Sequence, residues 1–411
     1  MKMMKLSSLG CFRNGMNYEK SAVTDGYKMI GVADFGNRVF PDIGSLSEID
    51  SSIVSEENLL QNGDILFVRS NGNKNLVGRS MLMRNIEEPI CYSGFCILLR
   101  PNREIVLPEY LFYALHSPFC RKQYSYSQQT NITNLSQTVL GAVDVPVPNI
   151  ETQSNLSEIL FNLDQKLALN SQLCTELESM AKTLYDYWFT QFDFPDENGK
   201  PYRTSGGEMV WNDQLKREIP KGWSVDNLYS IAEPINGLAC QKYRPKESEA
   251  ELPVVKIKEM HEGITADTEK VSASIPEKHK IFDGDILFSW SATLEVMYWF
   301  GGDAGLNQHI FKVVPINGFS KEYVYHQFSA YVINFVKMAE ARKTTMGHIT
   351  TDHLEQSRIA LPPSEIIQAF SKIVAPIHEK IGHCQKENRE LTKLRDWLLP
   401  MLMNGQAAVS D

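Results

Sequence analysis

Residues 156–190 read LSEILFNLDQKLALNSQLCTELESMAKTLYDYWFT, and this stretch predicts one long helix. Mostly apolar side chains recur at alternating steps of four and three residues, which places them along one side of the helix. We call this line of positions, along which a second helix could pack, the seam. A helix of about 35 residues would be about 50 Å long, which is too long for a compact domain. The seam positions are Leu163, Leu167, Asn170, Cys174, Leu177, Ala181, Leu184 and Trp188.

The same seam recurs 214 residues later, at the end of the sequence. A single stripe of this kind would indicate an ordinary helix that faces a core. Two matching stripes at a fixed offset favour two helices that pair with each other as an extended coiled-coil spacer. The second set of positions is Ile377, Ile381, Cys384, Asn388, Leu391, Arg395, Leu398 and Leu402.

The rest of the chain repeats as well, which indicates a tandem duplication. The segment NGDILFVRS at residues 62–70 is matched by DGDILFSWS at residues 283–291. Shorter matches join Asn14-Gly15 to Asn236-Gly237, Ile132-Thr133 to Ile349-Thr350, and Val147-Pro148 to Leu361-Pro362.

Each copy predicts a mixed α/β block. Short apolar runs bounded by Gly, Asn and Pro predict strands at residues 64–68, 95–99, 285–289 and 309–314. Helical segments are expected to follow them at residues 108–123 and 321–341. A turn that leads into a buried strand is common, so the repeated G-D-I-L-F element by itself indicates no chemistry. A polar loop and a strand that ends in proline then lead to each long helix.

The expected fold class is α+β: two similar mixed α/β blocks separated by a long antiparallel two-helix coiled coil, with an internal pseudo-two-fold. Similar units favour an isologous pairing, which makes the helices antiparallel and places one block at each end. The region from 192 to 223 is rich in Gly, Pro and polar residues and predicts an irregular connector. The expected divisions are a first block over 1–150, a first helix over 151–190, a connector over 191–220, a second block over 221–363 and a second helix over 364–404.

Composition is that of a globular protein, with 43% hydrophobic and 22% charged residues. The sequence has no run of about 18 uncharged apolar residues and no apolar signal segment, so we expect a cytoplasmic protein. The seven cysteines form no C-x-x-C pair, which predicts reduced thiols and no metal site. The net charge is -9, but most of the acidic excess lies in residues 151–220, so basic faces remain compatible with the two blocks.

No catalytic motif is present. The sequence has no G-x-G-x-x-G, no G-x-x-x-x-G-K-[ST] and no H-E-x-x-H. A methyltransferase-type Asp/Asn-Pro-Pro-aromatic tetrapeptide is also missing, because Leu361-Pro-Pro-Ser364 lacks the polar first residue. We therefore predict no catalytic residues and expect a partner to supply catalysis. Two related blocks on a rigid bar suit DNA, in which sites about 34 to 36 Å apart present the same groove.

Several segments resemble the specificity subunits of type I restriction-modification systems, and the resemblance covers essentially the whole chain. The most specific match is the connector, with DENGKPYRTSGGEMVW at residues 196–211 and IPKGW at residues 219–223. The repeated G-D-I-L-F strands, the segments NQHI at 307–310 and TTMGHIT at 344–350, and the terminal helix from Leu391 to Leu402 are similar as well.

This resemblance implies a DNA-binding subunit without enzyme activity of its own. The blocks would be two target recognition domains that each read a short half-site of double-stranded DNA, and the paired helices would set the spacer between the half-sites. Two methyltransferase subunits would dock on the helices with S-adenosylmethionine and methylate adenine. Restriction subunits would add ATP- and Mg-dependent translocation and cleavage, so this chain would bind no cofactor itself. The helix positions named for partner binding are Leu163, Leu167, Leu177, Leu184, Ile377, Ile381, Leu391 and Leu398.

Candidate DNA contacts follow from side-chain chemistry. Forked donors and amides suit base edges, while Lys, Ser, Thr and main-chain groups hold phosphates. The candidates in the first block are Arg38, Asn71, Lys74, Arg79, Gln128, Gln129, Thr130, Asn131, Thr133 and Asn134. Those in the second block are Lys242, Tyr243, Arg244, Lys246, Trp290, Arg342, Lys343, Thr344, Thr345 and His348.

Three other interpretations remain open at this point. A fused methyltransferase or nuclease would carry its own site, which the missing motifs disfavour. A coiled-coil adaptor would join two protein partners without binding DNA. The specificity half of a related modification system would share the same architecture but work with a different nuclease.

Overall fold

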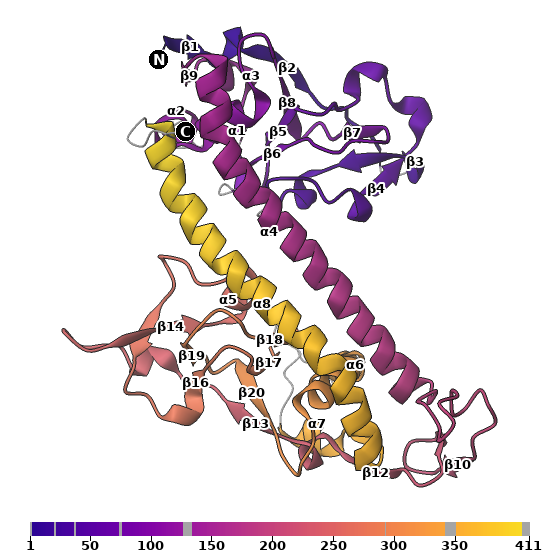
Figure 1. Cartoon of the computed structure of the whole chain (residues 1–411). Coiled ribbons are helices and arrows are strands. Elements are labelled where there is room, and N and C mark those ends of the chain that lie inside the picture. Colours follow the sequence, from indigo (N-terminus) through magenta and orange to yellow (C-terminus); the bar gives the residue numbers. More distant parts are fainter. Residues whose placement is uncertain are drawn as a thin grey trace. The chain divides into compact units, whose positions relative to one another are not determined.

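The structure is a computed structural model, and it describes residues 2–19, 22–36, 38–73, 76–125, 134–291, 293–341 and 351–404. The chain divides into two compact units, each of which mixes helices and strands (Figure 1). Unit 1 consists of Met1–Leu169 together with Glu390–Asp411. Unit 2 consists of Asn170–Arg389.

Unit 1 is built on an antiparallel four-stranded sheet with the order β2-β8-β5-β6. Its strands are β2 (Gly10–Asn14), β8 (Cys96–Pro101), β5 (Ile65–Val68) and β6 (Ser80–Leu82). A second sheet has the order β4-β3-β7, with β4 (Ser47–Ile49) antiparallel and β7 (Ile90–Tyr92) parallel to β3 (Val23–Ile30). The unit also contains the strand pair β1 (Lys2–Lys5) and β9 (Asp144–Val147), and the helices α1 (Pro108–His116), α2 (Pro118–Ser125) and α3 (Gln137–Gly141).

Unit 2 repeats this topology. Its antiparallel sheet has the order β13-β20-β17-β18, from β13 (Ala232–Asn236), β20 (Ile310–Pro315), β17 (Ile286–Ser289) and β18 (Glu295–Tyr298). The second sheet has the order β15-β14-β19-β16, from β15 (Lys270–Ser272), β14 (Glu251–Val255), β19 (Ala304–Leu306) and β16 (Lys280–Ile281). As in unit 1, the sheet contains one parallel pair, here β14 with β19, and β16 is an additional strand on the far side of β19. The strand pair is β12 (Ser224–Asn227) with β21 (Arg358–Leu361), and the helices are α5 (Ile257–Glu262), α6 (Lys321–Ala341) and α7 (Thr351–Gln356). The predicted duplication is confirmed at the level of strand order and direction.

The aspartate of each G-D-I-L-F element has a structural role. Asp64 accepts a hydrogen bond from the backbone N–H of Gln61 at 2.7 Å and pairs with Arg100 on β8, Oδ2 to Nη2, at 2.7 Å. Asp285 accepts from the N–H of Phe282 at 2.9 Å and pairs with Lys312 on β20 at 2.9 Å. Each carboxylate therefore closes the turn before a buried strand and neutralises a cation on the neighbouring strand.

Each long helix contributes to a hydrophobic core. In unit 1, Leu160 of α4 and Leu402 of α8 belong to the same buried cluster as Leu99 and Tyr110. In unit 2, Tyr185, Phe370 and Val374 belong to the cluster that contains Phe288 and Phe311. α4 spans Ile150–Tyr185 and continues as a π-helical turn over Asp186–Thr190, while α8 spans Ser364–Met403. Each long helix therefore belongs partly to unit 1 and partly to unit 2, with the boundary after Leu169 in α4 and after Arg389 in α8. The boundaries expected from the sequence lay instead at the ends of the helices.

Within unit 2 the two helices run antiparallel. The Asn170 side-chain amide donates to Glu387 at 2.7 Å and to Asn388 at 2.9 Å. Further along α4, Cys174 clusters with Ile381 and Cys384, which come earlier in α8. Every one of the sixteen predicted seam positions is buried or half-buried. The predicted seams and the predicted class, two similar mixed α/β domains with two long antiparallel paired helices, are therefore confirmed.

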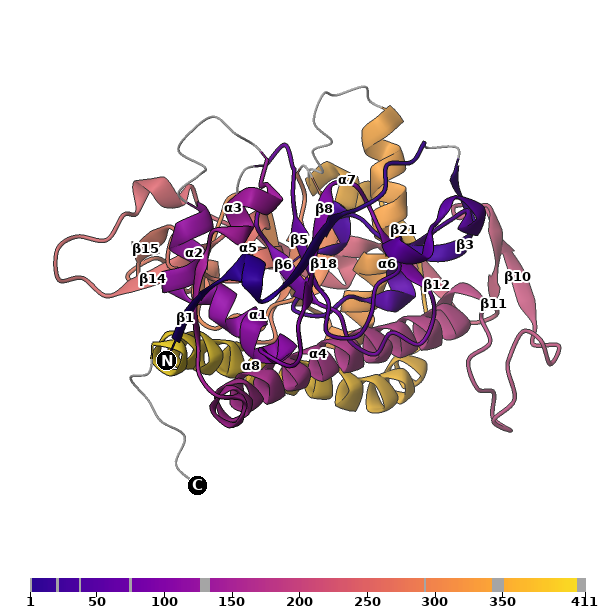
Figure 2. The same cartoon turned by 90° about the horizontal axis from the view of Figure 1, so that it is seen from above.

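The connector is ordered, which corrects the prediction of an irregular segment. Figures 1 and 2 show the hairpin of β10 (Met209–Asn212) and β11 (Arg217–Pro220) at the periphery of unit 2, beyond the C-terminal end of α4. The Phe194 ring stacks on Tyr202 at 4.7 Å and on Trp223 at 5.4 Å between centroids. Asp193 accepts hydrogen bonds from both the N–H and the hydroxyl of Thr204. The Gly and Pro content predicted a loop, but the aromatic residues close it into a packed structure.

Among the described residues, no helix combines the length and the apolar character that crossing a bilayer would require.

Candidate nucleic-acid interface

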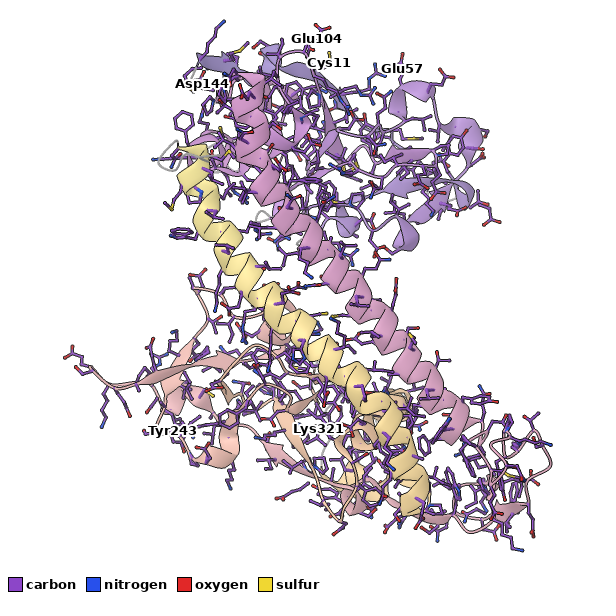
Figure 3. All side chains as sticks on the ribbon, viewed as in Figure 1. Cys11, Glu57, Glu104, Asp144, Tyr243 and Lys321 are labelled. Carbon is purple, nitrogen blue, oxygen red and sulfur yellow. The ribbon has the colours of Figure 1, made fainter. Side chains whose placement is uncertain are left out.

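Unit 2 presents a cationic segment that we call the basic loop, residues 242–246. Lys242 ends a 3-10 turn over Cys240–Lys242, and the side chains of Lys242, Tyr243, Arg244 and Lys246 are all exposed. Figure 3 shows Tyr243 at the periphery of unit 2, on the side of its sheets away from α8. Four of the predicted DNA contacts therefore lie together on one surface segment.

The basic loop is held by hydrogen bonds from the neighbouring strand. The backbone N–H of Ser272 donates to the carbonyl of Tyr243 at 2.8 Å. Glu249 accepts from the hydroxyls of Ser272 and Ser274 and from the N–H of Lys246. These donors, with Ser272 first, lower the pKa of Glu249 to about 2. The carboxylate is thus ionised at neutral pH and fixes the backbone of the loop.

The cations of the basic loop are available to an external anion. No described carboxylate lies within ion-pair distance of Lys242, Arg244 or Lys246, whereas Lys256 and Lys270 in the same unit are paired with Glu269 and Glu251. Unpaired exposed cations on a fixed loop are the groups that contact phosphates in protein–DNA complexes.

The described candidates of unit 1 make contacts within the unit. Arg38 pairs with Asp42 at 2.9 Å, and Arg79 donates to the carbonyl of Gly36 at 2.6 Å. The Asn71 side chain accepts from the N–H of Asn73 at 2.8 Å. These residues look like free donors in the sequence, because their partners are brought beside them only by the folded turns.

Nine of the seventeen predicted DNA contacts in the final set lie outside the described residues: Lys74, Gln128, Gln129, Asn131, Thr133, Arg342, Lys343, Thr344 and His348. The additional candidates Thr130 and Thr345 lie outside them as well. Asn134 is described, and it forms an isolated bridge with Ser70 at the end of β5.

Trp290 is half-buried and packs against neighbouring rings. Its ring lies 5.6 Å from that of His309 and 5.9 Å from that of Phe311. The exposed side chain at this place is His309, which the sequence analysis did not select. The corresponding residue of unit 1, Phe95, was also missed, although its side chain is 59% exposed. Aligning the two copies residue by residue would have drawn attention to both positions.

The seam leucines lie where the two helices pair, so the outer surface of each helix is formed by other residues. Met180 on α4 is 60% exposed, and Tyr187 in the π-helical turn that follows α4 is also exposed. On α8, Leu394 and Trp397 are 43% and 59% exposed. Leu394 follows Met180 by 214 residues, the offset of the repeat, so the exposed apolar position is itself duplicated. The positions named for partner binding are buried or half-buried, whereas these outer residues are exposed apolar side chains on the same helices.

No group of three or more His, Cys, Asp or Glu side chains suited to a metal ion occurs in the part of the chain that the structure describes.

Comparisons with known proteins agree with this architecture. Residues 1–179 and 220–393 match the family described as type I restriction modification DNA specificity domain, and the chain belongs to this family. The specificity subunit of the type I restriction enzyme HindI from Haemophilus influenzae is 26% identical over 403 residues, which cover 84% of this chain and 87% of that protein. The specificity subunit of EcoKI from Escherichia coli is 24% identical, with 90% of this chain and 81% of that protein covered.

The fold has a counterpart among solved structures. The crystal structure of a type I restriction-modification S subunit from M. genitalium superposes with a TM-score of 0.55 at 15% identity. The superposition covers 98% of this chain and 95% of that one. The resemblance predicted from the connector and the repeated strands is confirmed.

Proposed function

We propose that this chain reads a bipartite, asymmetric DNA target and recruits the methyltransferase and restriction subunits of a type I restriction-modification complex. The observation that carries the proposal is the basic loop of unit 2, in which three exposed cations without ion-pair partners among the described residues stand on a backbone fixed by Glu249. Cations on a backbone that is already fixed bind phosphates without the cost of ordering the loop at the moment of binding.

The duplication supports two half-sites of different sequence. The four-stranded antiparallel sheet has the same strand order in both units, so each offers the same frame to DNA. Their surfaces differ, because the cations of unit 1 that correspond in role, Arg38 and Arg79, are engaged inside the unit. Two related but unequal readers suit two unequal half-sites, and the paired helices would set the spacer between them.

The outer faces of the helices support recruitment of two copies of one partner. Met180 and Leu394 occupy equivalent positions of the repeat and expose apolar surface that makes no contribution to the helix seam. Contiguous exposed apolar surface marks protein interaction sites, and Leu394 is joined by the exposed Trp397 three residues further along α8. In this proposal the partners are two methyltransferase subunits, which bring S-adenosylmethionine. Restriction subunits bring the ATP- and Mg-dependent steps, and this chain supplies recognition without catalysis in the cytoplasm.

The test is salt-dependent DNA binding by the assembled methyltransferase complex. Replacing Lys242, Arg244 and Lys246 together by alanine should weaken binding to all duplexes, because phosphate contacts carry no sequence information. The slope of log affinity against log salt should become shallower by about 0.9 for each phosphate that the variant no longer neutralises.

The matched control is Lys216→Ala, an exposed lysine on the connector hairpin, which should leave the slope unchanged. An unchanged slope in the triple variant would contradict the role of the basic loop. Assembly with partner subunits but no DNA binding by the unmodified complex would instead support the adaptor interpretation.

A further inference from the structure

The two units carry the same tight turn at the same place in the fold. We call these turns the tips: Ser93–Phe95 before β8 in unit 1, and Asn307–His309 before β20 in unit 2. In the first, the N–H of Cys96 donates to the carbonyl of Ser93 at 2.9 Å. In the second, the N–H of Ile310 donates to the carbonyl of Asn307 at 3.1 Å. The side chains of Ser93 and Asn307 each accept from the N–H two residues on.

Each tip is anchored by the segment that follows the first strand of its sheet. The N–H of Gly94 donates to the backbone carbonyl of Met16 at 2.7 Å, and the N–H of Gln308 donates to the backbone carbonyl of Leu238 at 2.8 Å. The preceding glycines, Gly15 and Gly237, are tightly packed: a Cβ on either would lie 2.1 Å from the carbonyl oxygen of Ser93 or Asn307. This close approach explains the repeated Asn-Gly pair.

A third bond ties each tip to the end of the G-D-I-L-F strand. The N–H of Arg69 donates to the carbonyl of Phe95 at 2.8 Å, and the N–H of Trp290 donates to the carbonyl of His309 at 3.4 Å. The backbone frames are therefore equivalent, position by position. Phe95 corresponds to His309, Gly94 corresponds to Gln308, and Arg69 corresponds to Trp290.

The side chains on these equivalent frames differ in chemistry. Phe95 is apolar and more than half exposed, and the half-buried Arg69 beside it donates a long 3.4 Å bond to Gly94. Gln308 and His309 are polar, with Nε2 of Gln308 lying 3.3 Å from Nε2 of His309. An exposed phenyl ring on a fixed turn adds nothing to a core. Equivalent backbone positions that carry chemically different side chains are what two readers of different sequences require.

The position of the tips agrees with a DNA-facing role. Leu238, which anchors the unit 2 tip, is four residues before Lys242 and leads directly into the basic loop. In unit 1 the N–H of Leu135 donates to the carbonyl of Arg69 at 2.8 Å, and the predicted contact Asn134 pairs with Ser70. Each tip thus lies near a described residue that was predicted to contact DNA on independent grounds, Asn134 in unit 1 and Lys242 in unit 2.

We propose that the tips are specificity-determining elements that contact bases, with Phe95 and Arg69 acting in one half-site and Gln308 and His309 in the other. This inference rests on the proposed DNA-reading function. A phenyl ring recognises thymine methyl groups or stacks at a base step, while a glutamine amide offers a paired donor and acceptor that match adenine. The two tips therefore read different bases from one common backbone geometry.

The test uses the assembled methyltransferase complex and a duplex library in which both half-sites are randomised. Bound duplexes are sequenced for the unmodified chain, Phe95→Ala and Gln308→Ala. Each variant should lose discrimination by roughly 5- to 150-fold at one or two positions, which corresponds to the 1 to 3 kcal/mol of a specific base contact. The loss should fall in one half-site for Phe95→Ala and in the other for Gln308→Ala. The salt slope should stay unchanged, because base contacts release no phosphate counterions.

Two control variants keep the result interpretable. Phe119→Ala removes an exposed phenyl ring from α2 of unit 1 outside the tip, and Gln214→Ala removes an exposed amide from the connector of unit 2. Neither should change the selected sequences. A third variant, Gln308→Glu, keeps size and acceptor but loses the amide donors, so it should shift the preferred base rather than only relax it.

The outcomes separate this inference from the proposed function. Selected sequences that stay unchanged in Phe95→Ala and Gln308→Ala would overturn the role of the tips, and so would equal weakening at every position. In both of these outcomes the alanine variant of the basic loop can still make the slope of log affinity against log salt shallower. The proposed DNA binding by this chain would then be retained, and only the role of the tips would be rejected. If the unmodified complex enriches no sequence at all, the proposed function itself fails.

Discussion

Arg395 of α8 forms an ion pair with Asp164 of α4 inside unit 1, with 2.9 Å between Nη1 and Oδ1. The other carboxylate oxygen of Asp164 accepts from the hydroxyl of Tyr113, on α1, at 2.7 Å. Asp164 is 3% exposed, and this burial raises its pKa, while Arg395 and Tyr113 act in the opposite direction. Three helices of the unit therefore meet at one buried carboxylate.

Arg395→Ala should destabilise unit 1 strongly, because it leaves Asp164 buried without its counter-charge. A broken buried pair typically costs about 3 to 5 kcal/mol. Asp164→Ala should cost less, since the Arg395 side chain is 25% exposed and keeps its bond to Asp396. Urea denaturation with the double variant would measure the coupling. Lys393→Ala, at an exposed lysine of α8 two residues before Arg395, is the control, and equal effects of all three single variants would contradict this role of the ion pair.

Stability should fall in mild acid because of two buried histidines in unit 2. Burial lowers the pKa of His326 to about 3 and that of His378 to about 4. The unfolded chain binds protons below about pH 6.5, whereas the folded imidazoles stay neutral, so the loss begins near pH 6.5 and continues as pH falls toward about 4. Each histidine should contribute about 1.4 kcal/mol per pH unit in that window.

Unfolding free energies measured from pH 7.5 to pH 4.5 would check this pH dependence. In His326→Phe the unfolding free energy should fall less steeply with decreasing pH, because the unfolded chain binds about one proton fewer. The phenyl ring should be accommodated, because Tyr185 and Phe370 already pack against this position. His383→Phe changes an exposed histidine of α8 and serves as the comparison. A decline as steep as that of the unmodified chain would rule out His326 as its source.

Partner stoichiometry should respond to single changes on the outer helix faces. Met180→Glu and Trp397→Glu each place a charge in an exposed apolar stripe, and a buried unpaired charge at an interface is costly. Native mass spectrometry should show the loss of one methyltransferase copy in each single variant and of both in the double variant. Ile333→Glu, at an exposed apolar residue of α6, should leave two copies bound. Retention of both copies in the double variant would exclude these faces.

The two tryptophans of the connector should differ in their contribution to stability. Trp223 is 8% exposed inside the aromatic cluster, while Trp211 on the hairpin is 58% exposed. Trp223→Ala should cost about 3 to 5 kcal/mol, and Trp211→Ala should stay within about 0.5 kcal/mol. Urea denaturation followed by circular dichroism would measure both. A similar small effect for the two variants would mean that the connector adds little to unit 2.

Local patterns in the sequence were sufficient for the long helices, the repeated strands and the family. The periodicity of Leu163 to Trp188 and its copy near the C-terminus are readable because helix geometry depends on neighbouring residues. The same holds for the runs that became β5 and β17. The ordered connector was missed, since its Gly and Pro content is local whereas the contact of Phe194 with Trp223 joins residues far apart in the sequence.

Only the tertiary structure decided which charged and aromatic side chains are free to act. Arg38, Arg79 and Arg244 cannot be told apart in the sequence. In the structure Arg38 and Arg79 bind partners within unit 1, whereas Arg244 has no ion-pair partner among the described residues. The reason is that a side chain's availability depends on which distant backbone and carboxylate atoms the fold brings beside it. In the same way, Phe95 and His309 became comparable only when equivalent hydrogen bonds placed them on one common frame.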